Sequence, residues 1–314
     1  MAEGRDDVTA FFEDNPTPQV LTESADLVKA FVEDQVEKGL KVAVVTSGGT
    51  TVPLERNTVR YLDNFSEGRR GSSSAEEFLR SGYSVIFLHR KYSLQPYTRR
   101  FMTKARNFLD HLFLSEQGRI SVVPKYENQV KEAFEEYNEA KANNRLLCLT
   151  YVSVNDYLFM LREIGQCVQA LGKNSLIYLA AAVSDFYIPD ERLSEHKIQS
   201  KDNQNGLQLN LEPIPKMLGT LTKEWSPEAF IVSFKLETKD ELLESKALGS
   251  MKSYGQHIVI GNLLRNHQDQ VILYKRNGSQ QKICRSEGEK EALIDIETRF
   301  IPAITSLHYE YASQ

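Results

Sequence analysis

The chain has 314 residues, of which 41% are hydrophobic and 26% are charged, with 17 glycines and 10 prolines. This is the composition of a folded globular protein, and it excludes collagen-like, coiled-coil and wholly disordered chains. The 38 basic and 43 acidic residues leave a net charge of −5. We therefore expect the protein to bind neither nucleic acid nor a membrane surface through its overall charge, and any anion must be held by local positive groups.

The sequence also bears on the compartment. No apolar run approaches the ~20 residues of a membrane span, and the first ten residues lack the apolar core of a signal peptide. Cys148, Cys167 and Cys284 are too few and too scattered for a disulfide framework or a zinc site. These features predict a cytoplasmic protein with reduced thiols.

The first 40 residues are expected to form an acidic, proline-containing lead-in followed by one helix over residues 21–38. From residue 41 onward, runs of β-branched and apolar residues alternate with amphipathic segments, which is typical of buried parallel strands separated by helices. The expected buried strands are 41–46, 83–88, 146–151, 176–183, 230–234, 257–260 and 270–274. Residues 59–62 are expected to be strand-like, and 207–211 to form a half-exposed strand. The further expected helices are 72–80, 107–114, 126–143, 154–171, 215–224, 239–254 and 287–311.

This alternation predicts an α/β fold: a doubly wound, mostly parallel, Rossmann-like sheet flanked by helices. We expect residues 41–314 to form a single α/β domain that carries a flap over 186–206 and a helical insertion over about 90–145. The turn-forming residues 202–206 support the flap. Residues 90–106 hold six basic side chains and no acidic one. They are interpreted as a solvated loop, the alternative being that they line the cleft.

Functional residues of such sheets gather in the loops that follow the strands. The first strand runs into Ser47-Gly48-Gly49-Thr50, whose glycines let backbone N–H groups approach a phosphate. The same four residues can instead form nothing more than a tight turn. The loop is not a P-loop, because the Lys-Ser/Thr is missing, and it does not match a Gly-x-Gly-x-x-Gly fingerprint.

A second loop, from Asn64 to Gly71, carries more information. Gly68 and Gly71 flank two arginines at the expected start of a helix, where unpaired N–H groups and the helix dipole favour a polyphosphate. Asn64 offers an amide that can donate to a developing oxyanion or orient a carboxylate. A capped loop with solvated arginines is the alternative.

Two further groups of residues follow the strand over 176–183. That strand ends in small alanines, which permit close backbone approach, and Asp185 then provides an acceptor, although an aspartate in this position is more often a helix cap. In the flap, Lys197 and Lys201 can cover a phosphate as point cations, although lysines on a polar loop are usually only solvated.

Other chemistries find no support in the sequence. No set of histidine, cysteine and aspartate has the spacing of metal ligands, and no serine lies in a nucleophile elbow. We therefore expect no metal held by the protein itself and no covalent catalysis by one of its side chains.

Taken together, these stretches resemble the phosphopantothenate–cysteine ligases (phosphopantothenoylcysteine synthetases), in their stand-alone eukaryotic form. The resemblance covers residues 41 to the C-terminus in one order and is carried by 46–50, 52–54, 59–71, 180–189, 196–198, 233–238 and 259–262. It implies that the carboxylate of 4′-phosphopantothenate attacks the α-phosphorus of a nucleoside triphosphate, and that L-cysteine then captures the acyl-nucleotide. The reaction is a step of coenzyme A synthesis. Mg²⁺ accompanies the triphosphate as part of the co-substrate, and no flavin is implied.

The resemblance also implies roles for particular residues. Asn64 matches the asparagine that orients the carboxylate, and Lys197 matches the flap lysine that helps to form the intermediate. The expected contacts to the nucleotide are Gly48, Ser66, Gly68, Gly71, Phe234 and Asn262. Ala181, Ala182 and Asp185 match contacts to the pantothenate arm. The family draws these partly from a neighbouring subunit, so a homodimer with a shared active site is expected.

The chain departs from the bacterial members in two respects. Those members are usually fused to a flavin-dependent decarboxylase, for which no motif is found here. The stretches 67–70 and 90–143 resemble the stand-alone eukaryotic form, which implies ATP rather than strictly CTP. The flap places Lys197 and Lys201 four residues apart where bacterial forms have adjacent lysines, which leaves the division of roles between the two open.

Two other functions remain as alternatives. A Rossmann-type oxidoreductase that uses NAD would place an acidic residue at the end of the second strand of the sheet. His89-Arg90-Lys91 stands there instead, and these cations suit only the 2′-phosphate of NADP. A nucleotide-binding regulator would bind ATP without turnover.

Overall fold

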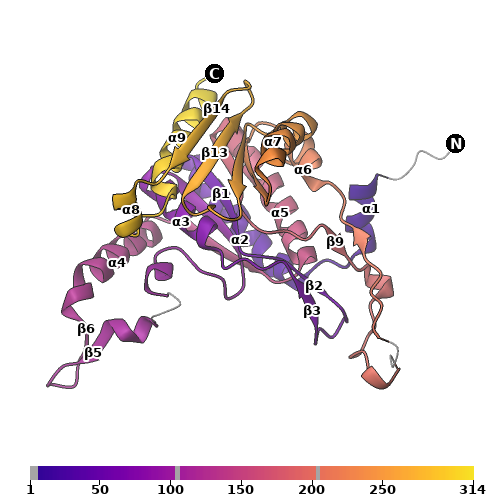
Figure 1. Ribbon diagram of the computed structural model, residues 1–314, viewed down its shortest axis with the longest axis horizontal. Coiled ribbons are helices and arrows are strands. Elements are labelled where there is room, and N and C mark those ends of the chain that lie inside the picture. Colours follow the sequence, from indigo (N-terminus) through magenta and orange to yellow (C-terminus); the bar gives the residue numbers. More distant parts are fainter. Residues whose placement is uncertain (1–5, 103–106, 203–205) are drawn as a thin grey trace.

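The computed structural model describes residues 6–102, 107–202 and 206–314, and within them the centre of the molecule is an eight-stranded sheet. Its strand order is β14-β13-β12-β11-β8-β1-β4-β7 (Figure 1). Neighbouring strands from β7 across to β12 are parallel, whereas β13 and β14 are antiparallel. The predicted doubly wound, mostly parallel α/β sheet is confirmed.

The strands and helices have the following bounds. The main sheet contains β1 (Val42–Ser47), β4 (Ser84–Arg90), β7 (Leu146–Tyr151), β8 (Ser175–Leu179), β11 (Phe230–Glu237), β12 (Ile258–Leu263), β13 (Gln270–Lys275) and β14 (Gln280–Cys284). Three hairpins pair β2 (Thr51–Pro53) with β3 (Tyr61–Asp63), β5 (Leu112–Leu114) with β6 (Ile120–Val122), and β9 (Phe186–Tyr187) with β10 (Glu212–Pro213). The α-helices are α1 (Asp7–Asp14), α2 (Gln19–Glu37), α3 (Arg69–Arg80), α4 (Glu127–Ala142), α5 (Val154–Val168), α6 (Met217–Thr220), α7 (Asp240–Tyr254), α8 (Glu287–Glu291) and α9 (Glu297–Ala312).

Both faces of the sheet are covered by helices, and the side-chain alternation of β1 shows why. Val42 and Val44 belong to one core cluster, with side chains of α1, α2 and α5. Ala43 and Val45 belong to the other, with α3, α4 and α9. Because successive side chains of a strand point to opposite faces, an unbroken apolar run is stable only when both faces are buried.

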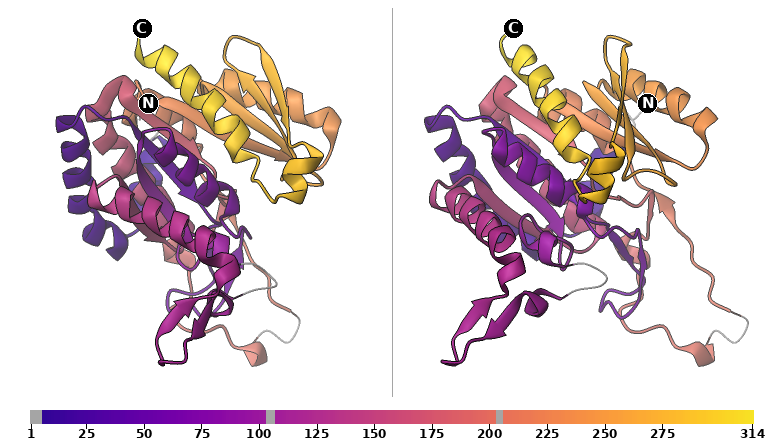
Figure 2. Two further views of the ribbon diagram at one scale, coloured as in Figure 1. Left: turned by 90° about the vertical axis from the view of Figure 1, so that its left-hand side faces the viewer. Right: turned by 60° about the vertical axis from the view of Figure 1, so that its left-hand side comes forward.

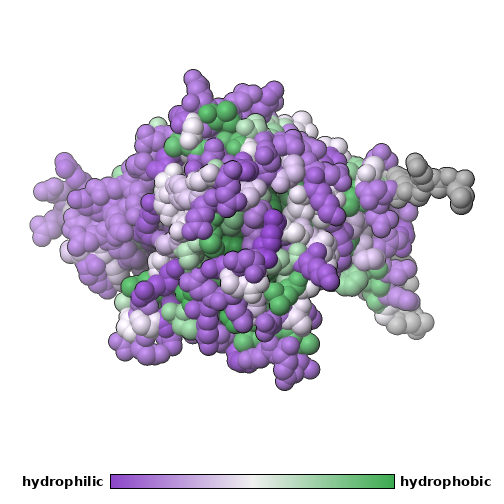
Figure 3. Space-filling view, turned by 90° about the horizontal axis from the view of Figure 1, so that it is seen from above, coloured by the Kyte–Doolittle hydropathy of each residue, from purple (hydrophilic) through white to green (hydrophobic). Residues whose placement is uncertain are grey.

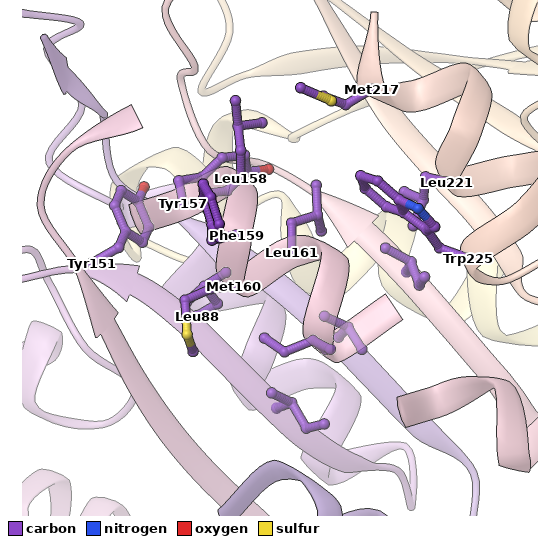
Figure 4. Packing of buried hydrophobic residues seen from close by; sticks show 14 of the residues in the cluster. Leu88, Tyr151, Tyr157, Leu158, Phe159, Met160, Leu161, Met217, Leu221 and Trp225 are labelled. Carbon is purple, nitrogen blue, oxygen red and sulfur yellow. The ribbon is translucent and has the colours of Figure 1, made fainter. Parts of the chain in front are cut away.

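Helix α5 shows how the first of these layers is packed. Its side chains, including Tyr157, Leu158 and Leu161, lie between the strands and the segment that carries Leu221 and Trp225 (Figure 4). Ser153 caps the helix by accepting a hydrogen bond from the backbone N–H of Asp156 at 3.0 Å. The buried apolar area stabilises the helix against the sheet, by roughly 1.5–3 kcal/mol for each large side chain.

Two parts of the chain extend away from the sheet. The segment between β4 and β7 contains the hairpin β5–β6 and helix α4, and it extends from the body of the molecule in two views (Figure 2). The predicted helical insertion is therefore only partly helical. The flap begins at β9, returns at β10 and also extends outward (Figure 1). Of its predicted range, 203–205 lie outside the described residues, as do 103–106 of the basic run and the first five residues of the lead-in.

The strand-like segment 59–62 is confirmed in part, since Tyr61 and Leu62 belong to the exposed strand β3, which pairs with β2 outside the main sheet. Other local predictions were wrong for identifiable reasons. Residues 107–114 form one short 3₁₀ turn and then β5, whose backbone is paired with β6. Residues 207–211 form no strand, because the pairing with β9 begins only at Glu212. The expected helix 287–311 is broken into α8 and α9, and Leu293 between them has a φ of +56°, which an α-helix cannot accommodate.

Several elements were not predicted, among them α1 and β14. The lead-in contains helix α1, and its Phe11 is only 2% exposed because it packs into the core beside Tyr187. Helices α1 and α2 therefore share the core of the sheet, and the division of the chain at residue 40 stays a prediction. Strand β14 is an edge strand of mostly exposed polar residues, so its sequence carries no apolar signal.

The basic run is not a solvated loop in its central part. Arg99 and Arg100 both pair with Glu76 of α3, at 2.7 and 2.8 Å, and the Glu76 side chain is fully buried. Arg99 also pairs with Asp295 at 2.6 Å. Charges removed from water in this way must be paired, so these contacts fix the insertion against α3 and the loop before α9.

No helix of the described ranges is both long enough and apolar enough to cross a membrane. The face seen from above in Figure 3 is largely hydrophilic at its rim and shows apolar side chains in patches nearer its centre.

The Glu76 pairs allow a first prediction. The Glu76→Gln substitution should lower the free energy of unfolding by about 3 kcal/mol, because the buried Arg99 and the largely buried Arg100 each lose one of their carboxylate partners. Urea denaturation at pH 7 measures the loss. Glu132→Gln is the control, since Glu132 is 63% exposed and lies 3.7 Å from Arg100. Equal, small effects of both substitutions would contradict the structural role.

A second prediction concerns pH. Burial lowers the pKa of His308 to about 4, and Lys41 adds to this effect. The neutral ring accepts a hydrogen bond from the Tyr83 hydroxyl at Nδ1 and donates one to the Lys173 carbonyl at Nε2, each at 2.8 Å. Because the pKa is depressed on folding, this stability is present above pH 6.5 and is lost as the pH falls from 6.5 towards 4, by about 3 kcal/mol.

The measurement is the free energy of unfolding between pH 4 and 7.5. The His308→Gln variant should show a flatter pH dependence than the wild type, whereas a variant of the exposed histidine, His196→Gln, should keep the wild-type slope. An unchanged slope in His308→Gln would show that other groups control the acid sensitivity.

Candidate functional site

The candidate site lies where the strand order of the sheet reverses. β1 has β4 on one side and β8 on the other, and ligands of open α/β sheets bind at the carboxyl ends of the strands at such a switch point. Beyond the strand ends, Ala182 donates to the Gly48 carbonyl at 2.8 Å and accepts from the Thr50 N–H at 3.0 Å. The loops after β1 and β8 are therefore joined directly at this point.

The glycine loop after β1 is shaped by contacts that exclude a side chain. A Cβ atom on Gly49 would lie 1.6 Å from the carbonyl oxygen of Asn64. Gly48 has a φ of +85°, and a Cβ there would lie 2.7 Å from that of Arg90. The backbone N–H of Asn64 donates to the Thr50 carbonyl at 3.0 Å. The loop is thus more than a tight turn, because it seats the Asn64 segment against the end of β1.

Helix α3 begins against the same loop. Its N-cap, Gly68, has a φ of +84°, and its carbonyl accepts from Ser47 Oγ at 3.0 Å. A Cβ on Gly71 would lie 2.4 Å from Ser47 Cβ. Ser66 Oγ accepts from the Gly68 N–H at 3.4 Å. The first turn of a 12-residue helix therefore lies beside the switch point, and its N–H groups and dipole make an anion site.

The two arginines of this turn have different surroundings. Arg70 pairs with Glu297 of α9 at 2.6 Å and donates to the His267 carbonyl. Arg69 makes no ion pair within the described residues. Only Arg69 thus keeps its charge available for an anion, whereas Arg70 joins the start of α3 to α9 and to the loop after β12.

The same arginine brings the predicted nucleoside contacts to this edge. The Arg70 guanidinium lies 6.0 Å from the centre of the Phe234 ring, and Phe234 packs edge-on against Tyr178 at 5.1 Å. Burial raises the pKa of Tyr178, so its hydroxyl stays protonated and bonds to Ser74 at 2.8 Å. Gly68, Gly71 and Phe234 are therefore gathered around Arg70.

Asn262 lies on the neighbouring strand β12, where it pairs in register with Leu236 of β11. Its Oδ1 is buried and has no hydrogen-bond partner within the described residues, and the same is true of Asn266 Oδ1. Buried acceptors without partners are costly, so both amides are suited to a donor that arrives with a ligand. Asn266 was missed by the sequence analysis, although its place four residues after Asn262 could have drawn attention to it.

The predicted substrate contacts occupy the other side of the switch point. Ala181 donates to Thr46 Oγ1 at 3.2 Å, and the Asp185 carbonyl accepts from Ile214 at 2.9 Å. Asp185 is exposed and Asn64 is half-buried, and neither side chain has a hydrogen bond within the part of the chain that the structure describes. Both remain available to a ligand.

The flap lysine is not in contact with this group of residues. Lys197 is exposed, and the residues on either side of it bond to residues 55–60, between β2 and β3. Within the described residues no hydrogen bond or ion pair joins Lys197 to the Gly68–Gly71 turn. The single chain therefore assembles the glycine loops, Phe234 and Asn262, but leaves Lys197 apart.

The described residues offer no cluster of metal ligands. Among residues 6–102, 107–202 and 206–314, no group of three or more histidine, cysteine, aspartate or glutamate side chains is arranged to hold a metal ion. The donors at this edge are N–H, amide and guanidinium groups, which suit anions.

Comparisons with known proteins show which family the chain belongs to. Residues 149–297 match the family model of the DNA/pantothenate metabolism flavoprotein C-terminal domain. A phosphopantothenate–cysteine ligase of Oryza sativa is 42% identical over 87% of this chain and 82% of its own length. The phosphopantothenate–cysteine ligase of Homo sapiens is 38% identical over 93% and 94%.

A solved structure gives the same result for the fold. A mutant of Cab2 in complex with phosphopantothenate-cysteine superposes with a TM-score of 0.89 at 39% identity, and the match covers 97% of this chain and 98% of that one. With these likenesses spanning nearly its whole length, the chain belongs to the phosphopantothenate–cysteine ligase family.

Proposed function

We propose that this protein joins 4′-phosphopantothenate to L-cysteine, at the expense of ATP, to give 4′-phospho-N-pantothenoyl-L-cysteine for coenzyme A synthesis. Membership of the ligase family supports the reaction. The observation that carries the proposal is the meeting of the glycine loop, the start of α3 and the Asn64 segment at the switch point. This arrangement offers backbone donors to a triphosphate beside an amide that can hold a carboxylate.

The reaction takes place in two steps. A carboxylate oxygen of the pantothenate moiety attacks the α-phosphorus, forming the acyl-adenylate and releasing pyrophosphate. The cysteine amine then attacks the acyl carbon, so that the amide forms, AMP leaves and the amine loses a proton. Neither step needs a protein nucleophile, because the enzyme contributes by holding the reactants together and by stabilising charge with fixed donors.

The residues divide between the substrates as follows. The phosphates and sugar of ATP, with its Mg²⁺ as part of the substrate, are assigned to the loops that carry Gly48, Ser66, Gly68 and Gly71. The nucleoside is assigned to Phe234 and Asn262, and the pantothenate arm to Ala181, Ala182 and Asp185. Asn64 orients the reacting carboxylate, and Lys197 offsets charge as the intermediate forms.

The assembly and compartment are part of the same proposal. A homodimer would let the flap of one subunit serve the site of the other, which would account for the separation of Lys197 from Gly68–Gly71 within one chain. A cytoplasmic location is supported by the three cysteine thiols, none of which is in a disulfide.

The oxidoreductase alternative is not favoured. It relied on the cations after β4 to bind the 2′-phosphate of NADP, but Arg90 is paired with Asp63 at 2.5 Å. A nucleotide-binding regulator would bind ATP without forming product, whereas a ligase forms product.

Single-turnover product analysis with ATP and CTP, with and without cysteine, tests the proposal. Pyrophosphate release that does not depend on phosphopantothenate would overturn it.

Asn64 yields the first functional prediction. Asn64→Ala should lower the rate of acyl-adenylate formation by on the order of 10²-fold, the usual cost of a lost oxyanion donor. The assay is pyrophosphate release in a single turnover. Asn155→Ala, which removes an amide bonded to Asn15 outside the site, should keep the wild-type rate. A nucleotide-binding regulator would release no pyrophosphate, with or without the substitution.

Lys197 yields the second functional prediction. Lys197→Ala should slow adenylate formation by on the order of 10²-fold while the KM for ATP changes little, because the charge acts on the transition state. Rates and KM are measured in steady state and in single turnovers, with Lys131→Ala on the surface of α4 as the control. Equal losses in rate and in ATP binding would make Lys197 an ordinary ground-state contact.

A further inference from the structure

The base of the flap is held against the turn between β2 and β3. Before Lys197, the backbone N–H of Arg56 donates to the Ser194 carbonyl at 2.9 Å, and that of Asn57 donates to the Glu195 carbonyl at 3.3 Å. These bonds run between backbone groups, so they fix the path of the chain as it approaches Lys197.

The residue after Lys197 is held by side chains. The backbone N–H of Ile198 donates to Glu55 Oε1 at 3.4 Å, and its carbonyl accepts from Arg60 Nη2 at 2.5 Å. Arg60 and Glu55 are themselves paired at 2.9 Å. Both polar groups of Ile198 are thus bound by one ion pair, and Lys197 lies between two fixed points.

Glu55 is the centre of this arrangement. Its side chain is fully buried, and it also accepts from the backbone N–H groups of Val59 and Arg60, at 3.4 and 3.0 Å. Burial by itself would raise the pKa of Glu55, but the hydrogen bonds from Arg60 and Ile198 outweigh burial and hold the pKa below its usual value. The carboxylate therefore remains ionised and able to accept at neutral pH.

The surroundings do not suggest that this buried charge serves the core. β3 is exposed along its whole length, and Val59 and Tyr61 are 53% and 50% exposed. Leu54 is the buried apolar residue of this turn, at 8% exposed. The Arg60 side chain is 40% exposed, and an ion pair of this kind is in general a weak source of stability. The hydrogen bonds of the pair are directional, and two of them bind the backbone N–H and carbonyl of Ile198 in the flap.

The same hairpin leads directly to Asn64. β3 ends at Asp63, which pairs with Thr51 of β2, and the next residue is Asn64. One short hairpin thus has the ion pair that holds the flap at its turn and the carboxylate-orienting asparagine at its end.

We propose that Glu55 and Arg60 are positioning residues, which fix the flap backbone so that Lys197 is placed for formation of the acyl-nucleotide. The inference rests on the proposed function. A rigid placement matters because a displacement of about 1 Å can cost on the order of 10²-fold in rate. Neither residue touches the substrates, and both act through Lys197.

The test is a pair of substitutions combined with Lys197→Ala. Glu55→Gln should lower kcat for pyrophosphate release by on the order of 10-fold with little change in the KM for ATP. In the Lys197→Ala background the same substitution should have almost no further effect, because the group being positioned is gone. Amide hydrogen exchange at Ile198 should become faster in Glu55→Gln.

Two further variants complete the design. Arg60→Gln removes the bond to the Ile198 carbonyl while Glu55 keeps its backbone donors, so it reports on the same clamp if Glu55→Gln fails to fold. Glu212→Gln is the matched control, because it breaks an exposed ion pair of the flap with Arg192 and should leave kcat unchanged.

The outcomes separate the two proposals. A wild-type protein that forms no acyl-nucleotide would overturn the proposed function and this inference with it. An active wild type with unaffected kcat in Glu55→Gln and Arg60→Gln would overturn the inference alone. So would a loss of the same factor with and without Lys197, since that is the result of a merely structural role.

Discussion

Backbone contact between three segments, made possible by glycine, is the constraint on which the site depends. A Cβ atom on Gly49 would overlap the Asn64 carbonyl, and one on Gly71 would overlap Ser47. Because glycine stands at both places, the end of β1, the Asn64 segment and the start of α3 meet in close backbone contact, which brings the N–H groups of the first turn of α3 to this point. An anion bound there is held by groups of fixed direction, which is the property that proximity catalysis requires.

Ion pairs hold segments that lie outside the main sheet in place. Arg70 and Glu297 connect the start of α3 to the C-terminal helix, Glu76 fixes the insertion through Arg99, and Glu55 holds the flap through Arg60. Apolar packing is non-directional and builds the two layers on the sheet. Charged hydrogen bonds are directional, so they suit segments whose exact position matters and whose apolar surface is small.

Much of the fold could be predicted from the sequence, and most of the failures share one cause. The strands β1, β4, β8 and β12 are apolar runs buried almost throughout, and β7, β11 and β13 are apolar runs with some residues at least partly exposed. Burial of such runs within a sheet is what stabilises them. β14 and β10 are short and polar, so their existence depends on the partners β13 and β9. The pairing of residues 112–114 likewise depends on their partner strand β6, and the break at Leu293 on a positive φ that an amphipathic pattern does not reveal.

The sequence by itself determined that glycines and alanines follow the central strands, and the parallel order of those strands brings their loops to one edge. It could not decide which of two adjacent arginines faces an anion, because that depends on where α9 places Glu297. Nor could it show that the Arg60 side chain holds the backbone of Ile198, 138 residues away. Such contacts form only when packing brings remote segments within hydrogen-bond distance. The spacing of residues along the sequence does not reveal which remote segments come that close.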